Sequence, residues 1–110
     1  FSLDSQHFAY EADGGYRSFI VLDGKEGKKY NWIWEPTFSP NSQHFAYITE
    51  EGNSFIVLDG KEGKKYDEIL PLRLKFSPDG QHLAYRAKEG NKRFVVLDGK
   101  EGKKYNGVDE

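Results

Sequence analysis

Three histidines at equivalent positions are the residues of this chain that could form a metal site. His7, His44 and His82 recur in near-identical stretches, and three imidazoles are a familiar ligand set for zinc. Equivalent residues of a repeat converge on one ion only if they line a common axis. These histidines fall on the second expected strand of each unit, not on the innermost one. We therefore predict no metal site, and expect each histidine to bond to backbone or to a neighbouring unit.

Three lysine-rich loops are the segments that could cradle a phosphate group. The run Asp-Gly-Lys-Glu-Gly-Lys-Lys occurs at 23–29, 59–65 and 98–104. A phosphate-binding loop needs G-x-x-x-x-G-K-[ST] between a strand and a helix, whereas here the glycines are closer and no Ser or Thr follows. The alternating acidic ligands of an EF-hand are also missing. We expect strand-to-strand hairpins with a solvated, charged rim.

No nucleophile or acid–base pair stands out from the repeat background. The chain has no cysteine, which excludes thiolate chemistry and disulfides. There is no Ser-His-Asp arrangement and no isolated pair of carboxylates. A catalytic residue copied into every repeat would serve no single active site. The sequence therefore predicts a protein that is not an enzyme and that uses no cofactor.

Length and charge narrow the class of protein further. The chain has 110 residues, with 16 Lys+Arg against 18 Asp+Glu and a formal net charge of −2. This length suits one small domain, and the mixed charge argues against a nucleic-acid or anionic-membrane binder. No stretch approaches the roughly 20 apolar residues that span a bilayer. No basic-then-apolar leader opens the sequence, and the composition does not indicate a compartment.

The chain is a threefold repeat within a single domain, 1–110. The stretch at 1–10 recurs at 38–47 and 76–85, and the stretch at 19–30 recurs at 55–66 and 94–105. The units are therefore 1–37, 38–75 and 76–110. Identity this high between copies indicates recent duplication or deliberate design.

Each unit is predicted to contain four short strands and no helix. In the third unit the first strand runs over 72–76, the second over 81–86 and the third over 93–97, with a hairpin through 98–102 and a fourth strand beginning at 103. The third strand of the first unit, 19–22, is apolar at consecutive positions. Both of its faces therefore need cover, which is typical of a strand inside stacked sheets.

The turn sequences identify the repeat. Phe76-Ser77-Pro78-Asp79-Gly80, followed by Leu83-Ala84-Tyr85, resembles the WD-like propeller repeat of the FSPDG type, found in the translocation protein TolB and in prolyl-oligopeptidase-type enzymes. The resemblance covers nearly the whole chain and implies three antiparallel blades of a β-propeller. It carries over no catalytic residue, because the catalytic groups of those enzymes lie in other domains.

Three blades do not close a ring. Propellers have roughly four to eight blades, and a stack of three would leave an apolar face bare at each end. We expect a head-to-tail homodimer of two chains, twofold symmetric, that completes six blades. The sequence begins inside an expected first strand and ends near the start of the next one, as a dimer seam would require. Two alternatives stay open: a β-trefoil, which closes within one chain, and a propeller fragment of a larger enzyme or periplasmic transport protein that acts as a docking or gating domain.

Topology predicts where a protein or peptide ligand would bind. First-to-second and third-to-fourth connections meet at one end of each unit, which we call the uniform rim because its turns are near-identical. The other connections meet at the variable rim, where the copies differ and recognition residues could lie. The candidate binding residues there and near the central channel are Trp32, Trp34, Glu35 and Arg73. The competing explanation for the two tryptophans is that they pack between sheets.

Overall fold

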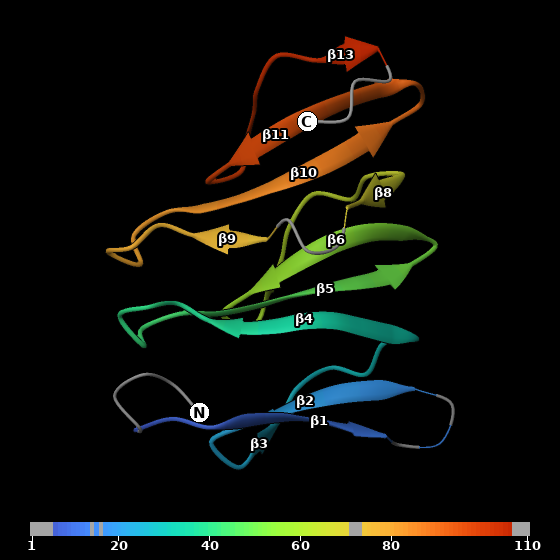
Figure 1. The fold of residues 1–110 in the computed structure, drawn as a ribbon. Coiled ribbons are helices and arrows are strands. Elements are labelled where there is room, and N and C mark those ends of the chain that lie inside the picture. The colour runs from blue at the N-terminus through green and yellow to red at the C-terminus, as the bar shows by residue number, and fades with distance from the viewer. Residues whose placement is uncertain (1–5, 14, 16, 71–73, 107–110) are drawn as a thin grey trace.

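The chain folds into strands and turns. The computed structural model describes residues 6–13, 15, 17–70 and 74–106, and these residues contain no helix (Figure 1). The predicted all-β fold class is confirmed. The strands form three antiparallel sheets in chain order.

The three sheets have related strand orders. The first sheet is β1 (Ala9–Asp13), β2 (Ser18–Leu22) and β3 (Lys25–Glu26). The second is β4 (Trp32–Phe38), β5 (Phe45–Glu51), β6 (Asn53–Leu58) and β7 (Lys61–Glu62). The third is β8 (Glu68–Ile69), β10 (Leu83–Glu89), β11 (Lys92–Leu97) and β12 (Lys100–Glu101), with β9 (Lys75–Phe76) beside β10 and β13 (Tyr105–Asn106) beside β11.

The first strand of a sheet comes from the end of the preceding repeat unit. β4 covers residues 32–38 and pairs with β5, so the second sheet begins before Phe38. In the third sheet this position is shared by β8 and β9, which both pair with β10. Part of the strand predicted over 72–76 lies outside the described residues, because 71–73 are among those not described.

The hairpins after the third strands are tighter than predicted. Leu97 pairs with Lys100, so the turn has only two residues, Asp98 and Gly99, with φ of 50° and 82°. Positive φ at both positions is the geometry of the favoured two-residue hairpin turn, for which Asp-Gly is a preferred sequence. The predicted hairpin through 98–102 was therefore too long. The fourth strand already starts at Lys100, not at 103, and pairs again near Tyr105.

The sheets stack face to face in the order of the chain (Figure 1). One core cluster joins the first and second sheets, around Ile20, Tyr30 and Phe55. A second cluster joins the second and third sheets, around Ile56, Tyr66 and Phe94. In the second sheet, β5 and β6 send successive side chains alternately into the two clusters. The consecutive apolar run at 55–58 is therefore explained by cover on both sides.

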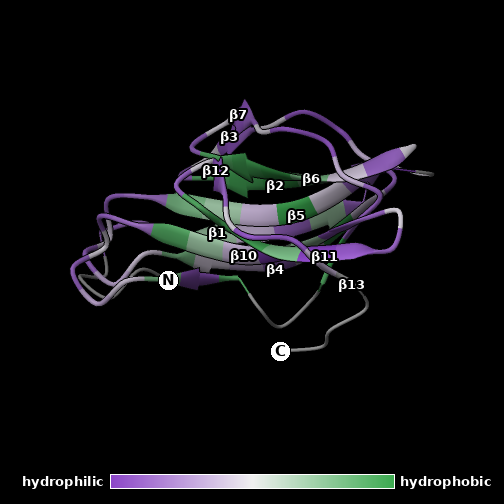
Figure 2. Cartoon of the chain, turned by 90° about the horizontal axis from the view of Figure 1, so that it is seen from above, coloured by the Kyte–Doolittle hydropathy of each residue, from purple (hydrophilic) through white to green (hydrophobic). Residues whose placement is uncertain are grey.

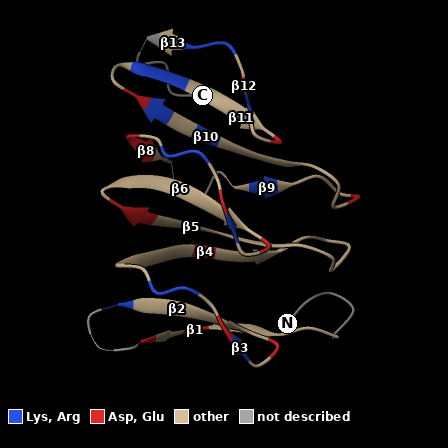
Figure 3. Ribbon diagram, turned by 180° about the vertical axis from the view of Figure 1, so that it is seen from behind, with Lys and Arg blue, Asp and Glu red and all other residues tan. Residues whose placement is uncertain are grey.

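Viewed along the stack, equivalent strands occupy equivalent places. Figure 2 shows β3, β7 and β12 at one edge of the stack and β4 near the other, with the apolar segments between them. Figure 3 shows the charged residues gathered on the hairpins and strand ends, while the middle of β2 and β6 carries none. Each sheet thus presents the same apolar centre and the same charged edge to its neighbour.

Candidate interaction surfaces

Each histidine at the uniform rim is held by an aspartate of its own repeat. The imidazole Nδ1 lies 2.6–2.7 Å from the Oδ2 atom of the aspartate in the hairpin turn. The Oδ1 atom of the same aspartate accepts the backbone N–H of the residue after the histidine, at 2.9 Å. These partners differ from the backbone groups or neighbouring unit that we expected. The pairs are His7–Asp23, His44–Asp59 and His82–Asp98.

This arrangement is a structural brace between two turns. The carboxylate fixes the turn after the third strand against the start of the second strand, so both connections of the uniform rim meet, as topology predicted. The described residues hold no group of three or more His, Asp or Glu side chains that could bind a metal ion. The histidines are thus separate braces, one for each sheet.

The brace in the third sheet should make stability depend on pH. The Asp98 carboxylate raises the pKa of His82 above its ordinary 6.5, so the folded state favours the protonated imidazole. This contribution is present below pH 6.5 and is lost as the pH rises through the folded-state pKa. We expect the urea midpoint of the wild type, measured from pH 6 to 9, to fall relative to that of His82→Gln. Parallel pH profiles for the two proteins would contradict this role.

A lysine and a tyrosine of one sheet bind a glutamate of the next sheet, and we call this arrangement the latch. Between the first and second sheets, Glu62 Oε2 accepts Lys28 Nζ at 3.1 Å and the Tyr30 hydroxyl at 2.7 Å. Between the second and third sheets, Glu101 Oε2 accepts Lys64 Nζ at 2.7 Å and the Tyr66 hydroxyl at 3.0 Å. The latch therefore occurs at both internal interfaces.

The electrostatics of the latch agree with its geometry. Hydrogen bonds from Lys64 and Tyr66 lower the pKa of Glu101 to about 2, and those from Tyr30 and Lys28 lower the pKa of Glu62. Burial, and then the bond to glutamate, raises the pKa of Tyr30 and of Tyr66. The loops were expected to form only a solvated charged rim. That expectation was incomplete, because one lysine and one glutamate of the repeated loop bridge adjacent sheets.

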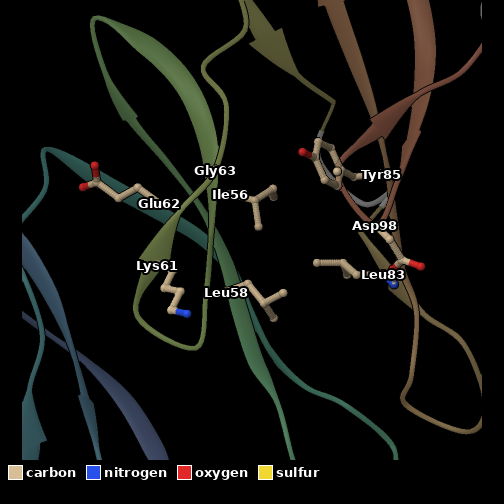
Figure 4. A pocket seen from close by; sticks show the side chains of 9 residues that line it. Ile56, Leu58, Lys61, Glu62, Gly63, Leu83, Tyr85 and Asp98 are labelled. Carbon is tan, nitrogen blue, oxygen red and sulfur yellow. Dashed lines mark hydrogen bonds between the residues drawn. The ribbon is translucent and has the colours of Figure 1, made fainter.

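The apolar contacts at the internal interfaces follow a fixed pattern. In the second sheet, Ala46, Ile56 and Leu58 face the third sheet, where Leu83 and Tyr85 meet them. Figure 4 shows Ile56 and Leu58 pointing toward Leu83 across a groove of about 350 Å³. One surface of each interface is thus built on small and aliphatic residues, and the opposing surface on larger ones.

The stack ends in two outer faces, which correspond to the two opposing surfaces of an internal interface. The first-sheet face is the side of the first sheet turned away from the second, with Phe8, Tyr10, Phe19 and Val21. Phe8 and Tyr10 are exposed there, whereas Phe19 and Val21 are only 9% and 6% exposed. Tyr10 is 54% exposed and its ring stacks on that of Phe8, 6.4 Å between centroids. The residues at equivalent positions in the second sheet are all buried against the first: Phe45, Tyr47, Phe55 and Val57.

The third-sheet face is the outer side of the third sheet, with Ala84, Val95, Leu97 and Tyr105. Val95 is 47% exposed and Leu97 51%. The residues that correspond to these two in the second sheet, Ile56 and Leu58, belong to or pack against the core. The same positions of the repeat are therefore covered inside the stack and open at its end.

The tryptophans predicted at the variable rim are exposed. Trp32 pairs with Glu50 near the turn between β5 and β6, so it does lie at that rim. Trp32 is 57% exposed and Trp34 38%, and their rings stack with 6.4 Å between centroids. Packing between sheets therefore covers Trp34 only in part and leaves Trp32 mostly exposed. Trp34 also lines a groove of about 350 Å³ together with Glu50, Asp67 and Glu68. An indole beside carboxylates suits a cationic group.

Of the other two predicted residues, Glu35 and Arg73, the structure describes only Glu35. Glu35 sits at a β-bulge between Trp34 and Thr37, with φ of 52°. Its Oε2 atom is buried without a hydrogen-bond partner among the described residues. Burial raises the pKa of Glu35, and a hydrogen bond from the Leu74 backbone opposes the rise. Arg73 lies outside the described residues.

Comparison with known protein families, with curated proteins and with solved structures found no match. The described residues also include no helix long and apolar enough to cross a membrane. The two outer faces and the variable rim are therefore assigned from the structure of this chain alone.

Proposed function

We propose that this chain is a non-enzymatic β-propeller scaffold that assembles with a second copy of itself. Each of the three sheets is a blade, and each chain supplies half of a six-bladed ring. Two chains meet head to tail, so that the third-sheet face of each covers the first-sheet face of the other. We call each of these two contacts a seam.

The observation that carries the proposal is the exposure of Val95 and Leu97 at one end of the stack and of Phe8 and Tyr10 at the other. Val95 and Leu97 are half exposed although the equivalent Ile56 and Leu58 are mostly covered. Tyr10 is exposed although the equivalent Tyr47 is buried. The two outer faces are the two halves of an interface that the chain already forms twice internally. Apolar faces of this kind on soluble proteins mark interaction sites.

A scaffold role also agrees with the chemistry of the repeats. The polar clusters of the uniform rim occur once in every sheet and brace turns. A ligand of the ring, a protein or a peptide, would bind at the variable rim, where the stacked Trp32 and Trp34 adjoin a groove with carboxylates.

The β-trefoil alternative fits the chain less well. In a β-trefoil the repeats share one barrel, whereas here each sheet keeps its own strands and faces the next one. A docking or gating fragment of a larger enzyme or periplasmic transport protein would use the same outer faces to contact further blades. A chain that stays monomeric in solution would favour this alternative.

The mass in solution tests the proposal. We expect light scattering coupled to size exclusion to give about 25 kDa, twice the chain mass of 12.7 kDa, at high concentration. Dilution from about 100 μM to about 0.1 μM should reveal the monomer, because seams of moderate size bind with finite affinity. A single mass of 12.7 kDa throughout the series would overturn the proposed assembly.

A further inference from the structure

We propose that Lys103 and Tyr105 of one chain bind the Glu26 carboxylate of a second copy, as a third and intermolecular form of the latch. This inference rests on the proposed function and names the polar contact that sets the register of the seam. A second copy of this chain then covers the two outer faces. It is held by the same kinds of atoms that form the two internal latches.

The two internal latches define the geometry that the seam would repeat. In both, the lysine and the tyrosine lie two residues apart and donate to the same Oε2 atom of a glutamate in the next sheet. The distances lie between 2.7 and 3.1 Å. Hydrogen bonds to an ionised carboxylate, from an ammonium or a hydroxyl, are stronger than those between neutral groups.

The donors on the third-sheet face are already in the latch arrangement. Lys103 Nζ lies 5.5 Å from the centroid of the Tyr105 ring. The corresponding distance is 5.5 Å for Lys28 over Tyr30 and 5.4 Å for Lys64 over Tyr66. Tyr105 is nevertheless 47% exposed, whereas Tyr30 and Tyr66 are 2% and 1% exposed. The local geometry is thus complete and only the acceptor sheet is lacking.

The acceptor on the first sheet occupies the matching backbone position. Glu26 pairs with Val21 across the hairpin, just as Glu62 pairs with Val57 and Glu101 with Val96. Glu26 is exposed. Among the described residues, no hydrogen bond or ion pair engages the side chain of Glu26 or the hydroxyl of Tyr105. One donor pair and one acceptor are therefore left over, at opposite ends of the stack.

Head-to-tail symmetry brings the Lys103 and Tyr105 donors of one chain to the Glu26 acceptor of the other. In a ring of two chains, each chain gives Lys103 and Tyr105 to one seam and Glu26 to the other. Both seams then have opposite charges facing each other. A shifted approach of the two chains would leave the Glu26 carboxylate and its donors unpaired within the interface, which is costly. The latch therefore supplies specificity to an otherwise apolar contact.

A charge exchange between two variants tests the intermolecular latch. Glu26→Lys alone faces Lys103 in both seams, and Lys103→Glu alone faces Glu26 in both seams. We expect either variant alone to dimerise about 100-fold more weakly than the wild type, about tenfold at each seam. Mixing the two gives one wild-type pair and one exchanged pair, so native mass spectrometry should show almost only the mixed dimer.

Matched variants separate this inference from the proposed function. Glu68→Lys and Lys75→Glu change the charge equally at exposed positions away from the latch, and their mixture should give a statistical 1:2:1 distribution. Circular dichroism checks that every variant is folded. If the wild type dimerises but the exchanged variants also homodimerise fully and mix statistically, the latch is wrong and the assembly stands. If the wild type is a monomer, both are wrong.

Discussion

Replacing Phe55 with alanine should remove much of the stability of the folded chain. Phe55 is fully buried between the first and second sheets, and its ring meets Tyr30 edge-on at 5.8 Å between centroids. Truncating a buried phenylalanine costs about 3–5 kcal/mol, from lost transfer energy and the cavity left behind. A small domain has about 5–15 kcal/mol of stability in total. We therefore expect a large drop in the urea midpoint, measured by circular dichroism at low chain concentration.

Val95→Ala is the matched control for that loss. Val95 lies on the third-sheet face and is 47% exposed, so its truncation should change the stability of the monomer by about 0.5 kcal/mol or less. Equal losses for Phe55→Ala and Val95→Ala would show that the first and second sheets do not form the buried interface described above.

Replacing Leu97 with glutamate should abolish the proposed dimer while leaving the fold intact. Leu97 is 51% exposed in the single chain, so a charge there remains solvated in the monomer. In the seam it would lie against the first-sheet face of the partner, since the equivalent Leu58 packs into the internal interface. A buried, unpaired charge costs several kcal/mol. Because both seams carry the change, we expect the dimer Kd to rise by more than about 100-fold.

Gln81→Glu provides a charge-matched comparison for Leu97→Glu. Gln81 is exposed at the uniform rim, away from both outer faces, and its substitution adds the same charge. It should keep the mass of the wild type in light scattering. A Leu97→Glu protein that still dimerises like the wild type would exclude the third-sheet face from the seam.

The sequence was sufficient to predict the second and third strands of each unit, but not the start of the fourth strand or the burial of each copy. Phe19-Ile20-Val21-Leu22 and Phe94-Val95-Val96-Leu97 are near-identical and form equivalent strands, β2 and β11. Yet Ile20 is buried and Val95 half exposed. Local sequence fixes which face of a strand is apolar, whereas burial depends on whether another sheet lies against that face. No pattern within one repeat contains that information.

The polar contacts were harder to predict because they depend on register. His44 and Asp59 are fifteen residues apart and meet only because Ala46 pairs with Leu58. The latches join residues more than thirty positions apart, on different sheets. The exact recurrence of Lys-Glu-Gly-Lys-Lys-Tyr was the signal available, and it was interpreted as a hairpin rim. The bulge at Glu35 has no counterpart in the sequence pattern.

The stacking of each sheet only on its neighbours has a consequence for how the molecule unfolds. In such a linear array, stability is the sum of what each unit contributes and what each contact between adjacent units adds. The end units have one such contact and therefore fray first, while the middle unit has two. A closed ring has no end units, so melting must begin by breaking two contacts at once, and unfolding becomes more cooperative than in the isolated chain.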